Sequence, residues 1–169
     1  MNESVLKVKA GRIRMLILDV DGTLTDGGVY IDVNGVQSKK FNIKDGMGIR
    51  MIQEQGIIVG IISHSRANTI LEARARMLFM DPRYVYSGNE PKLTILEGWL
   101  NELGITYDQV AYIGDDFNDV EILTRVGLSA CPRDAHDSVL GKVDVILKKK
   151  GGKGCVREFI DRFLLHPMV

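Results

Sequence analysis

Short runs of aliphatic residues alternate with longer stretches of helical period along this chain of 169 residues, and no other feature constrains its fold as strongly. The aliphatic runs hardly alternate in polarity, which is typical of parallel strands buried on both faces. The strands that we expect are Met15–Val20, Ile57–Ser63, Tyr84–Ser87, Val110–Gly114, Leu128–Cys131 and Val143–Leu147. The helices that we expect between them are Gly46–Gln55, Arg66–Leu78, Pro91–Leu103, Asn118–Val126 and Cys155–Leu165. This order predicts an α/β fold, a parallel sheet with helices on both faces, in a single domain over residues 1–169.

One segment interrupts the alternation directly after the first expected strand. Val29–Asp32 and Val36–Phe41, joined by Val33, Asn34 and Gly35, predict a β-hairpin within a flap of about residues 27–42. The hairpin contains few apolar residues, so it cannot bury much surface by itself. We therefore expect it to lie against a partner surface, which is a first indication of oligomerisation.

Composition narrows the class of protein. Lys and Arg together number 22, as do Asp and Glu, so the formal net charge is zero. A neutral chain has no overall field that attracts a nucleic acid or an anionic membrane, and we expect neither as a partner. The two cysteines form no CxxC motif or Cys–His cluster, which excludes a disulfide framework and a thiolate zinc site. Without a signal-peptide pattern or an apolar run near the roughly 20 residues of a membrane span, the sequence predicts a cytoplasmic protein.

Acidic residues follow two of the expected strands, at the edge where open parallel sheets bind ligands. Asp19 and Asp21 would point the same way if the first strand continued to Asp21, and Gly22 would let the backbone turn close to a ligand. Further along, Asp115 and Asp119 have the i, i+4 spacing of one helical face. A single Asp in such a place is more often a cap or turn residue. Several converging carboxylates repel one another and need a cation, and oxygen ligands favour Mg²⁺ over zinc.

Two other strand ends offer groups that bind anions. Ser63 ends the second expected strand and is followed by His64 and Arg66, so a hydroxyl, backbone N–H groups and a helix start face one anion. Lys92 begins the helix after the third strand. A lone lysine at a helix start is more often a solvated surface charge, so the interpretation of Lys92 depends on the other motifs.

Four segments, taken in chain order, resemble the four motifs of the haloacid dehalogenase phosphatase superfamily. They are Asp19–Thr23, Ser63, Lys92 and Gly114–Asp119. The DxDGT and GDDxxD segments carry most of the resemblance, and the single Ser and Lys gain meaning beside them. The resemblance implies a Rossmann-like core in which Asp19 is a nucleophile that forms an aspartyl-phosphate and Asp21 is general acid and base.

The same resemblance implies the ligands of metal and phosphate. Mg²⁺ would be held by Asp19, the backbone carbonyl of Asp21, and Asp115, while Ser63 and Lys92 would bind the phosphoryl oxygens. Such an arrangement suits phosphoryl transfer, in which positioning and charge neutralisation supply most of the catalysis. The other residues assigned to phosphate or substrate are Thr23, His64, Arg66, Lys44 and Arg157, and those assigned a supporting role are Gly22, Asp116, Asn118 and Asp119.

Most superfamily members carry a cap domain after the first or second motif, and this chain has room for neither. The resemblance narrows to the capless subgroup that includes 3-deoxy-D-manno-octulosonate 8-phosphate (KDO 8-phosphate) phosphatase, with matching stretches such as LDVDGTLTDGGVY and AYIGDDFND. It implies hydrolysis of a phosphorylated 3-deoxy-2-keto sugar acid, in the first place KDO 8-phosphate to KDO plus phosphate. It also implies a homotetramer, in which the hairpin and the basic C-terminal tail, about residues 148–169, complete a neighbour's active site.

The sequence departs from this subgroup in one loop and leaves alternatives open. Ser63-His64-Ser65-Arg66 stands where the subgroup usually has a Thr-Gly-Arg type turn. Because this loop lies where phosphate and substrate meet, a nine-carbon substrate, 2-keto-3-deoxynononate 9-phosphate or sialic acid 9-phosphate, is an alternative.

Two interpretations from other classes are also open. The fold resembles the C-terminal domain of animal CMP-sialic acid synthetases, a non-catalytic tetramerisation module, and loss of the motif carboxylates would mark that role. All of them are present here. A signalling receiver domain also accepts phosphate on Asp, but it is shorter and lacks both the hairpin and a GDDxxD segment.

Overall fold

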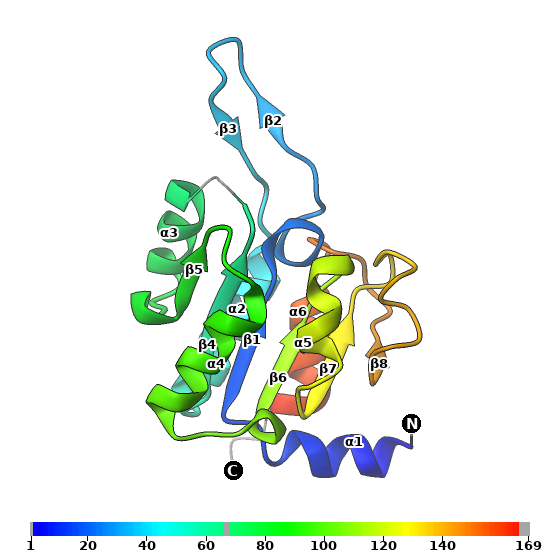
Figure 1. Ribbon diagram of the computed structural model, residues 1–169. Coiled ribbons are helices and arrows are strands. Elements are labelled where there is room, and N and C mark those ends of the chain that lie inside the picture. The colour runs from blue at the N-terminus through cyan, green and yellow to red at the C-terminus, as the bar shows by residue number, and fades with distance from the viewer. Residues whose placement is uncertain (1, 66–67, 166–169) are drawn as a thin grey trace.

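The computed structural model describes residues 2–65 and 68–165, and within them the central feature is a six-stranded parallel sheet of order β5-β4-β1-β6-β7-β8 (Figure 1). Its strands are β1 (Met15–Leu18), β4 (Ile58–Ser63), β5 (Val85–Ser87), β6 (Val110–Ile113), β7 (Leu128–Cys131) and β8 (Val145–Ile146). Each neighbouring pair runs parallel, so the carboxyl ends of all these strands meet at one edge. The predicted α/β fold is confirmed.

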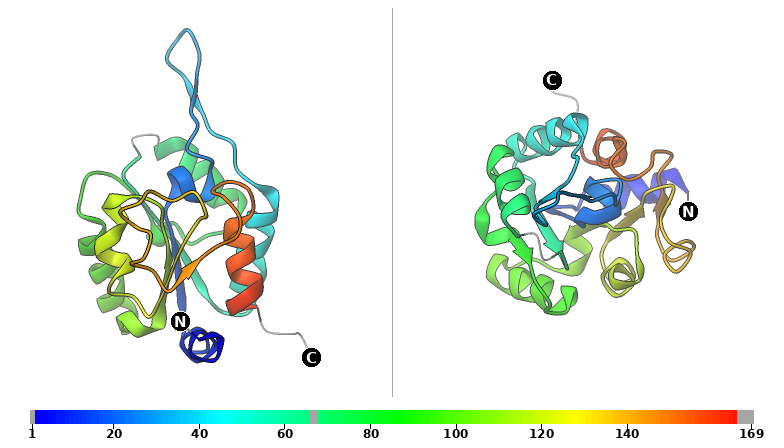
Figure 2. Two further views of the ribbon diagram at one scale, coloured as in Figure 1. Left: turned by 90° about the vertical axis from the view of Figure 1, so that its right-hand side faces the viewer. Right: turned by 90° about the horizontal axis from the view of Figure 1, so that it is seen from above.

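Helices cover both faces of the sheet (Figure 2). One face packs against α2 (Ile43–Glu54), α3 (Asn68–Met77) and α6 (Cys155–Phe159, continued by a turn over Ile160–Leu164). The other packs against α4 (Lys92–Leu103) and α5 (Val120–Leu123). In β1 the side chains of Leu16 and Leu18 enter the first of these cores, while Met15 and Ile17 enter the second. Burial on both sides explains why the strand sequences do not alternate in polarity.

The N-terminal segment contains a helix that the sequence did not lead us to expect. This helix, α1 (Glu3–Ala10), begins at Asn2, whose side chain accepts a hydrogen bond from the N–H of Ser4. Only Leu6 and Ala10 are buried in it. Its frequent charges hid the narrow apolar stripe, so the periodicity was too weak to predict the helix.

Several predicted elements are shorter in the structure, and two of these differences shape the carboxyl edge of the sheet. The first strand ends at Leu18 rather than Val20, and Val20–Leu24 forms one tight turn. The helix expected over Asn118–Val126 is reduced to α5, which follows a single 3-10 turn at Phe117–Asp119. Both shortened segments thereby become loops that present side chains above the sheet.

The predicted hairpin is present as β2 (Tyr30–Ile31) and β3 (Gln37–Ser38), paired antiparallel. It projects from the carboxyl edge of the sheet, beyond the helices (Figure 1). Its apolar side chains are exposed, and Val33 at the tip is fully so. Among the described residues there is no helix with the length and apolar character needed to span a membrane.

Candidate active site

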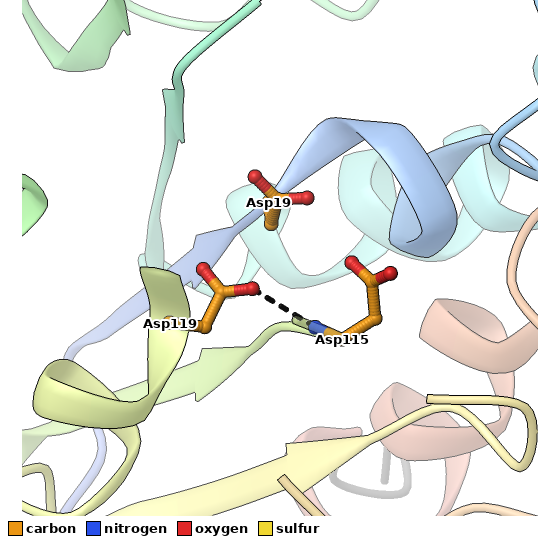
Figure 3. Close-up of side chains that lie close together, drawn as sticks. All are labelled: Asp19, Asp115 and Asp119. Atoms are coloured by element: carbon orange, nitrogen blue, oxygen red, sulfur yellow. Dashed lines mark hydrogen bonds between the residues drawn. The ribbon is translucent and has the colours of Figure 1, made fainter. Parts of the chain in front are cut away.

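Three carboxylates meet above the carboxyl ends of two neighbouring strands (Figure 3). Asp19 follows β1, and Asp115 and Asp119 follow β6; one oxygen of each lies within 4.8 Å of the others. Oδ2 of Asp119 accepts hydrogen bonds from the backbone N–H groups of Asp115 (3.0 Å) and Asp116 (3.2 Å). These hydrogen bonds close the loop and bring Asp115 and Asp119 together. The prediction that these two residues lie on one face of a helix is wrong, because Asp115 precedes the 3-10 turn at Phe117–Asp119.

Lys92 lies inside this cluster and is not a surface charge. Its side chain is 1% exposed, and Nζ lies 2.6 Å from both Oδ1 of Asp19 and Oδ1 of Asp119. It stands at the first turn of α4, which packs against the sheet and so fixes where the ammonium lies. Tyr112 on β6 donates a hydrogen bond from its hydroxyl to Oδ1 of Asp119 (2.6 Å).

The electrostatics of the cluster show an excess of negative charge. Burial, reinforced by the charge of Asp119 and opposed by Lys92, raises the pKa of Asp19 to about 7. Burial, with the charges of Asp19 and Asp119, raises the pKa of Asp115 to about 8. Burial works against the charged form of Lys92, but the two carboxylates outweigh it and raise the pKa of the ammonium. One lysine does not balance three acids, so the site favours a further cation.

The donor set and the space around it suit a hard divalent cation such as Mg²⁺. The three candidate ligands are all carboxylates, which hard cations prefer. Gly22 has φ +89°, and a Cβ there would lie 1.9 Å from Oδ2 of Asp115, so only glycine leaves room for that carboxylate. Thr23 donates a hydrogen bond from its hydroxyl to Oδ1 of Asp115 (3.3 Å) and orients it.

Asp21 does not join the three clustered carboxylates. The sequence predicted that Asp19 and Asp21 point the same way if the first strand continued to Asp21, and that condition is not met, because β1 ends at Leu18. Both oxygens of Asp21 lie 2.6 Å from Nζ of Lys39, a residue that follows β3 of the hairpin. The first motif thus gives one carboxylate to the sheet edge and one to the hairpin.

The loop after β4 carries the groups expected to bind an anion. Ser63 is buried at the end of β4, the strand that pairs with β1. Its hydroxyl accepts a hydrogen bond from the N–H of Ser65 (3.0 Å). Nε2 of His64 lies 3.0 Å from the carbonyl oxygen of Glu90, and its Nδ1 lies 3.3 Å from Nδ2 of Asn118. His64 therefore connects three loops at the carboxyl edge. Arg66 lies outside the described residues.

The side chains of the remaining candidates make other contacts or are exposed. Lys44 is exposed on the first turn of α2, and Nε of Arg157 pairs with Asp161 on its own helix at 2.6 Å. Asp116 accepts a hydrogen bond from the N–H of Phe117 and is exposed. The substrate-binding roles of Lys44 and Arg157 stay predictions.

The glycines of the tail pack directly on the first-motif loop of their own chain. The N–H of Gly152 donates to the carbonyl oxygen of Thr23 (3.0 Å), and a Cβ on Gly151 would lie 1.8 Å from the carbonyl oxygen of Gly22. A side chain at Gly151 would displace that loop. This explains why small residues interrupt the basic run.

Two residues of the site, Tyr112 and Lys39, were not predicted from the sequence. Tyr112 is a polar aromatic residue in an otherwise aliphatic strand, and that exception is a signal that could have identified it. Its pKa is raised well above the usual range, because it is buried beside Asp119 and Asp19. Lys39 gave no comparable signal, since adjacent lysines near a hairpin usually face solvent.

Comparisons with known proteins agree with this geometry. Residues 79–160 match the haloacid dehalogenase-like hydrolase family. The chain is 41% identical over 157 residues to 3-deoxy-D-manno-octulosonate 8-phosphate phosphatase of Escherichia coli K12, covering 93% of this chain and 82% of that protein.

Two solved structures of such phosphatases superpose closely on the chain. That from Yersinia pestis has a TM-score of 0.90 at 40% identity and covers 94% of this chain and 84% of its own. That from Moraxella catarrhalis, determined with a magnesium ion, phosphate and KDO, has a TM-score of 0.89 at 31% identity and covers 95% and 90%.

Proposed function

The chain belongs to the 3-deoxy-D-manno-octulosonate 8-phosphate phosphatases, within the haloacid dehalogenase-like hydrolases, and we propose that it hydrolyses KDO 8-phosphate to KDO and phosphate with Mg²⁺. The observation that carries this proposal is the group of buried Asp19, Lys92 and Asp119 with partly buried Asp115 at the carboxyl edge of the sheet. Its presence disfavours a purely structural module, which has no need of three buried charged groups and a fourth beside them.

We propose that Asp19 is the nucleophile. Lys92 donates to Oδ1 of Asp19, so Oδ2 is the oxygen available for attack on phosphorus. Attack forms a bond from Asp19 to phosphorus and breaks the ester bond, which gives an aspartyl-phosphate and a sugar alkoxide. Lys92, placed within reach of the reacting carboxylate, also offsets charge that builds up on the phosphoryl oxygens.

Asp21 moves the proton in both half-reactions. As an acid it protonates the departing sugar oxygen; as a base it takes a proton from the water that then attacks the aspartyl-phosphate. That attack breaks the bond between Asp19 and phosphorus and releases inorganic phosphate. In this proposal the side chain of Asp21 is not a metal ligand, which leaves it to carry the proton.

The Mg²⁺ ligands in this proposal are side-chain oxygens of Asp19 and Asp115 and the backbone carbonyl of Asp21. Bound there, Mg²⁺ acts as a Lewis acid on the phosphoryl group. Asp119 takes a supporting role, because its two oxygens are occupied by Lys92, Tyr112 and backbone N–H groups. Ser63 is the further candidate for a phosphoryl contact.

We also propose a homotetramer in the cytoplasm. The exposed apolar side chains of the hairpin, Val29, Tyr30, Ile31, Val33 and Val36, support association, because monomeric surfaces rarely carry so many together. Both cysteines are buried free thiols, which suits a reducing compartment. Dilution below the assembly limit should lower activity together with oligomer mass, and an equally active monomer would contradict the shared site.

A substrate comparison tests the proposed reaction. With Mg²⁺, kcat/KM for KDO 8-phosphate should exceed that for 2-keto-3-deoxynononate 9-phosphate, sialic acid 9-phosphate and simple sugar phosphates. A preference for a nine-carbon acid would reassign the substrate, consistent with the unusual His64 loop. Equal activity on all of these esters would contradict the sugar-acid assignment.

A further inference from the structure

The hairpin is exposed along most of its length, yet one of its lysines is buried. The side chain of Lys39 is 2% exposed, whereas that of its neighbour Lys40 is 55% exposed. Burying an ammonium is unfavourable unless opposite charge and hydrogen bonds surround it. The exception at Lys39 therefore requires a specific set of partners.

Those partners are Asp21 and Ser65. Nζ of Lys39 lies 2.6 Å from Oδ1 and 2.6 Å from Oδ2 of Asp21, and 2.8 Å from the hydroxyl oxygen of Ser65. An ammonium group has three N–H donors, and these three oxygens occupy all of them. A contact that includes both oxygens fixes the carboxylate plane as well as its position.

The backbone that carries Lys39 is anchored to the domain on its C-terminal side. The ring of Phe41 packs against the core, and the guanidinium carbon of Arg74 lies 5.3 Å from the ring centre. Nδ2 of Asn42 donates to the carbonyl oxygen of Gly152 (3.2 Å). These contacts fix the backbone next to Lys39, and so the position of its ammonium, although the tip of the hairpin does not contact the domain.

The geometry points to Lys39 as the residue that positions Asp21 for proton transfer. This inference rests on the proposed function, in which Asp21 protonates the departing oxygen. A carboxylate that is 38% exposed would otherwise sample several rotamers, and proton transfer requires one hydrogen-bond geometry. While Asp21 carries the proton, one of its oxygens holds it toward the departing oxygen and the other still accepts from Lys39. Lys39 contacts Asp21 and acts through it, so it is a positioning residue.

The test uses two aryl esters that differ in leaving-group basicity far more than in size. Phenyl phosphate has a basic leaving group that needs the proton from Asp21, whereas p-nitrophenyl phosphate has a good leaving group that does not. For Lys39→Met, we expect kcat/KM on phenyl phosphate to fall about 100-fold, the usual lower range of general acid catalysis, and on p-nitrophenyl phosphate less than about threefold. This parameter reports the steps up to aspartyl-phosphate formation.

Matched variants separate positioning from folding. Lys39→Arg should keep most of the wild-type kcat/KM on phenyl phosphate. Lys40→Met, which removes an exposed lysine one residue away, should have the wild-type kcat/KM on both esters. Asp21→Asn should show the same selectivity between the two esters, and adding Lys39→Met to it should cost no further activity. Should Lys39→Met fail to fold, Lys39→Gln, which keeps hydrogen bonding without charge, takes its place.

Several results would overturn the inference. Equal losses on both esters would show a general structural defect, and additive losses in the double variant would show that Lys39 does not act through Asp21. A raised KM for KDO 8-phosphate with unchanged rates on both aryl esters would assign Lys39 to the substrate instead. If the wild-type enzyme did not hydrolyse KDO 8-phosphate, while Lys39→Met still lost activity on phenyl phosphate and not on p-nitrophenyl phosphate, the proposed substrate would be wrong. The role of Lys39 would stand.

Discussion

The two aspartates of the first motif are each paired with a buried lysine, but the lysines come from different parts of the molecule. Lys92 pairs with Asp19 and stands on α4, packed against the sheet. Lys39 pairs with Asp21 and stands on the hairpin that projects beyond the helices. The contact distance is the same, 2.6 Å, in both pairs.

The difference lies in the surroundings of the carboxylates. The side chain of Asp19 is 8% exposed and that of Asp21 is 38% exposed. Lys92 therefore neutralises charge in a place that water hardly reaches, while Lys39 orients a group that stays open to water and substrate. Under our proposal, the scaffold supplies the attacking group and the hairpin controls the group that moves the proton.

The largest difference between the two regions is expected in the loss of stability when each lysine is replaced by methionine. Lys92→Met leaves two buried carboxylates without their cation, so we expect the free energy of unfolding to fall by about 3 kcal/mol and kcat by roughly 10³-fold. Lys39→Met should cost about 1 kcal/mol or less, because one partner is well exposed to water. Urea unfolding measures both values. Equal losses would remove the distinction between a structural and a positioning lysine.

Two glycines with positive φ sharpen the comparison through backbone sterics. Gly22→Ala places a methyl group on the Asp115 carboxylate, so we expect a loss of about 2–4 kcal/mol and weakened Mg²⁺ binding. Gly35 lies at the hairpin tip, where no atom lies within 4 Å of the added Cβ. Gly35→Ala should therefore lower the free energy of unfolding by only about 1 kcal/mol, the cost of a positive φ in a residue with a side chain. Calorimetric titration with Mg²⁺ should show weakened binding for Gly22→Ala alone. Normal Mg²⁺ affinity in that variant would contradict the assignment of Asp115 as a ligand.

The pH dependence of Mg²⁺ binding gives a smaller effect. Because the pKa values of Asp19 and Asp115 are raised to about 7 and about 8, the metal-free fold keeps protons that the unfolded chain releases near pH 4. The contribution of these groups to stability therefore falls as pH rises from about 4 to about 8. Mg²⁺ replaces those protons, so its stabilising effect should grow over the same range.

Thermal unfolding at two pH values measures this effect. At pH 8, Mg²⁺ at about 100 times its Kd should add about 2.7 kcal/mol, or about 5–10 °C in Tm. At pH 5 we expect a shift below about 2 °C for the same addition, because protons hold the site. Equal shifts at both pH values would contradict carboxylate ligands with raised pKa values.

Most of the scaffold could be predicted from the sequence, because strand burial imposes a direct pattern. β1 is buried on both faces, and its sequence is therefore an unbroken run of apolar residues. The acidic residues that follow it indicate where the carboxyl edge of the sheet lies. What the pattern does not give is where the strand ends. The turn after Leu18 depends on Gly22 and on packing against Gly151, far away in the chain, and Asp21 within it contacts Lys39 of the hairpin.

The hairpin could be predicted as an element, but not its contribution to the site. Lys39 and Lys40 are identical in type and adjacent in sequence, yet one is buried against Asp21 and the other pairs with Asp26 at 3.0 Å. The next residues, Phe41 and Asn42, are anchored to the domain by contacts with segments far away in the chain. Such long-range contacts leave no periodicity in the local sequence.

A burst experiment tests the division of labour between the two aspartates most directly. Asp21→Asn, mixed rapidly with p-nitrophenyl phosphate and Mg²⁺, can form the aspartyl-phosphate but lacks the base that activates water. We predict a burst of about one equivalent of p-nitrophenol per active site, followed by turnover at least about 100-fold slower than wild type, while Asp19→Asn gives no burst. A burst from Asp19→Asn, or undiminished steady turnover by Asp21→Asn, would contradict the account.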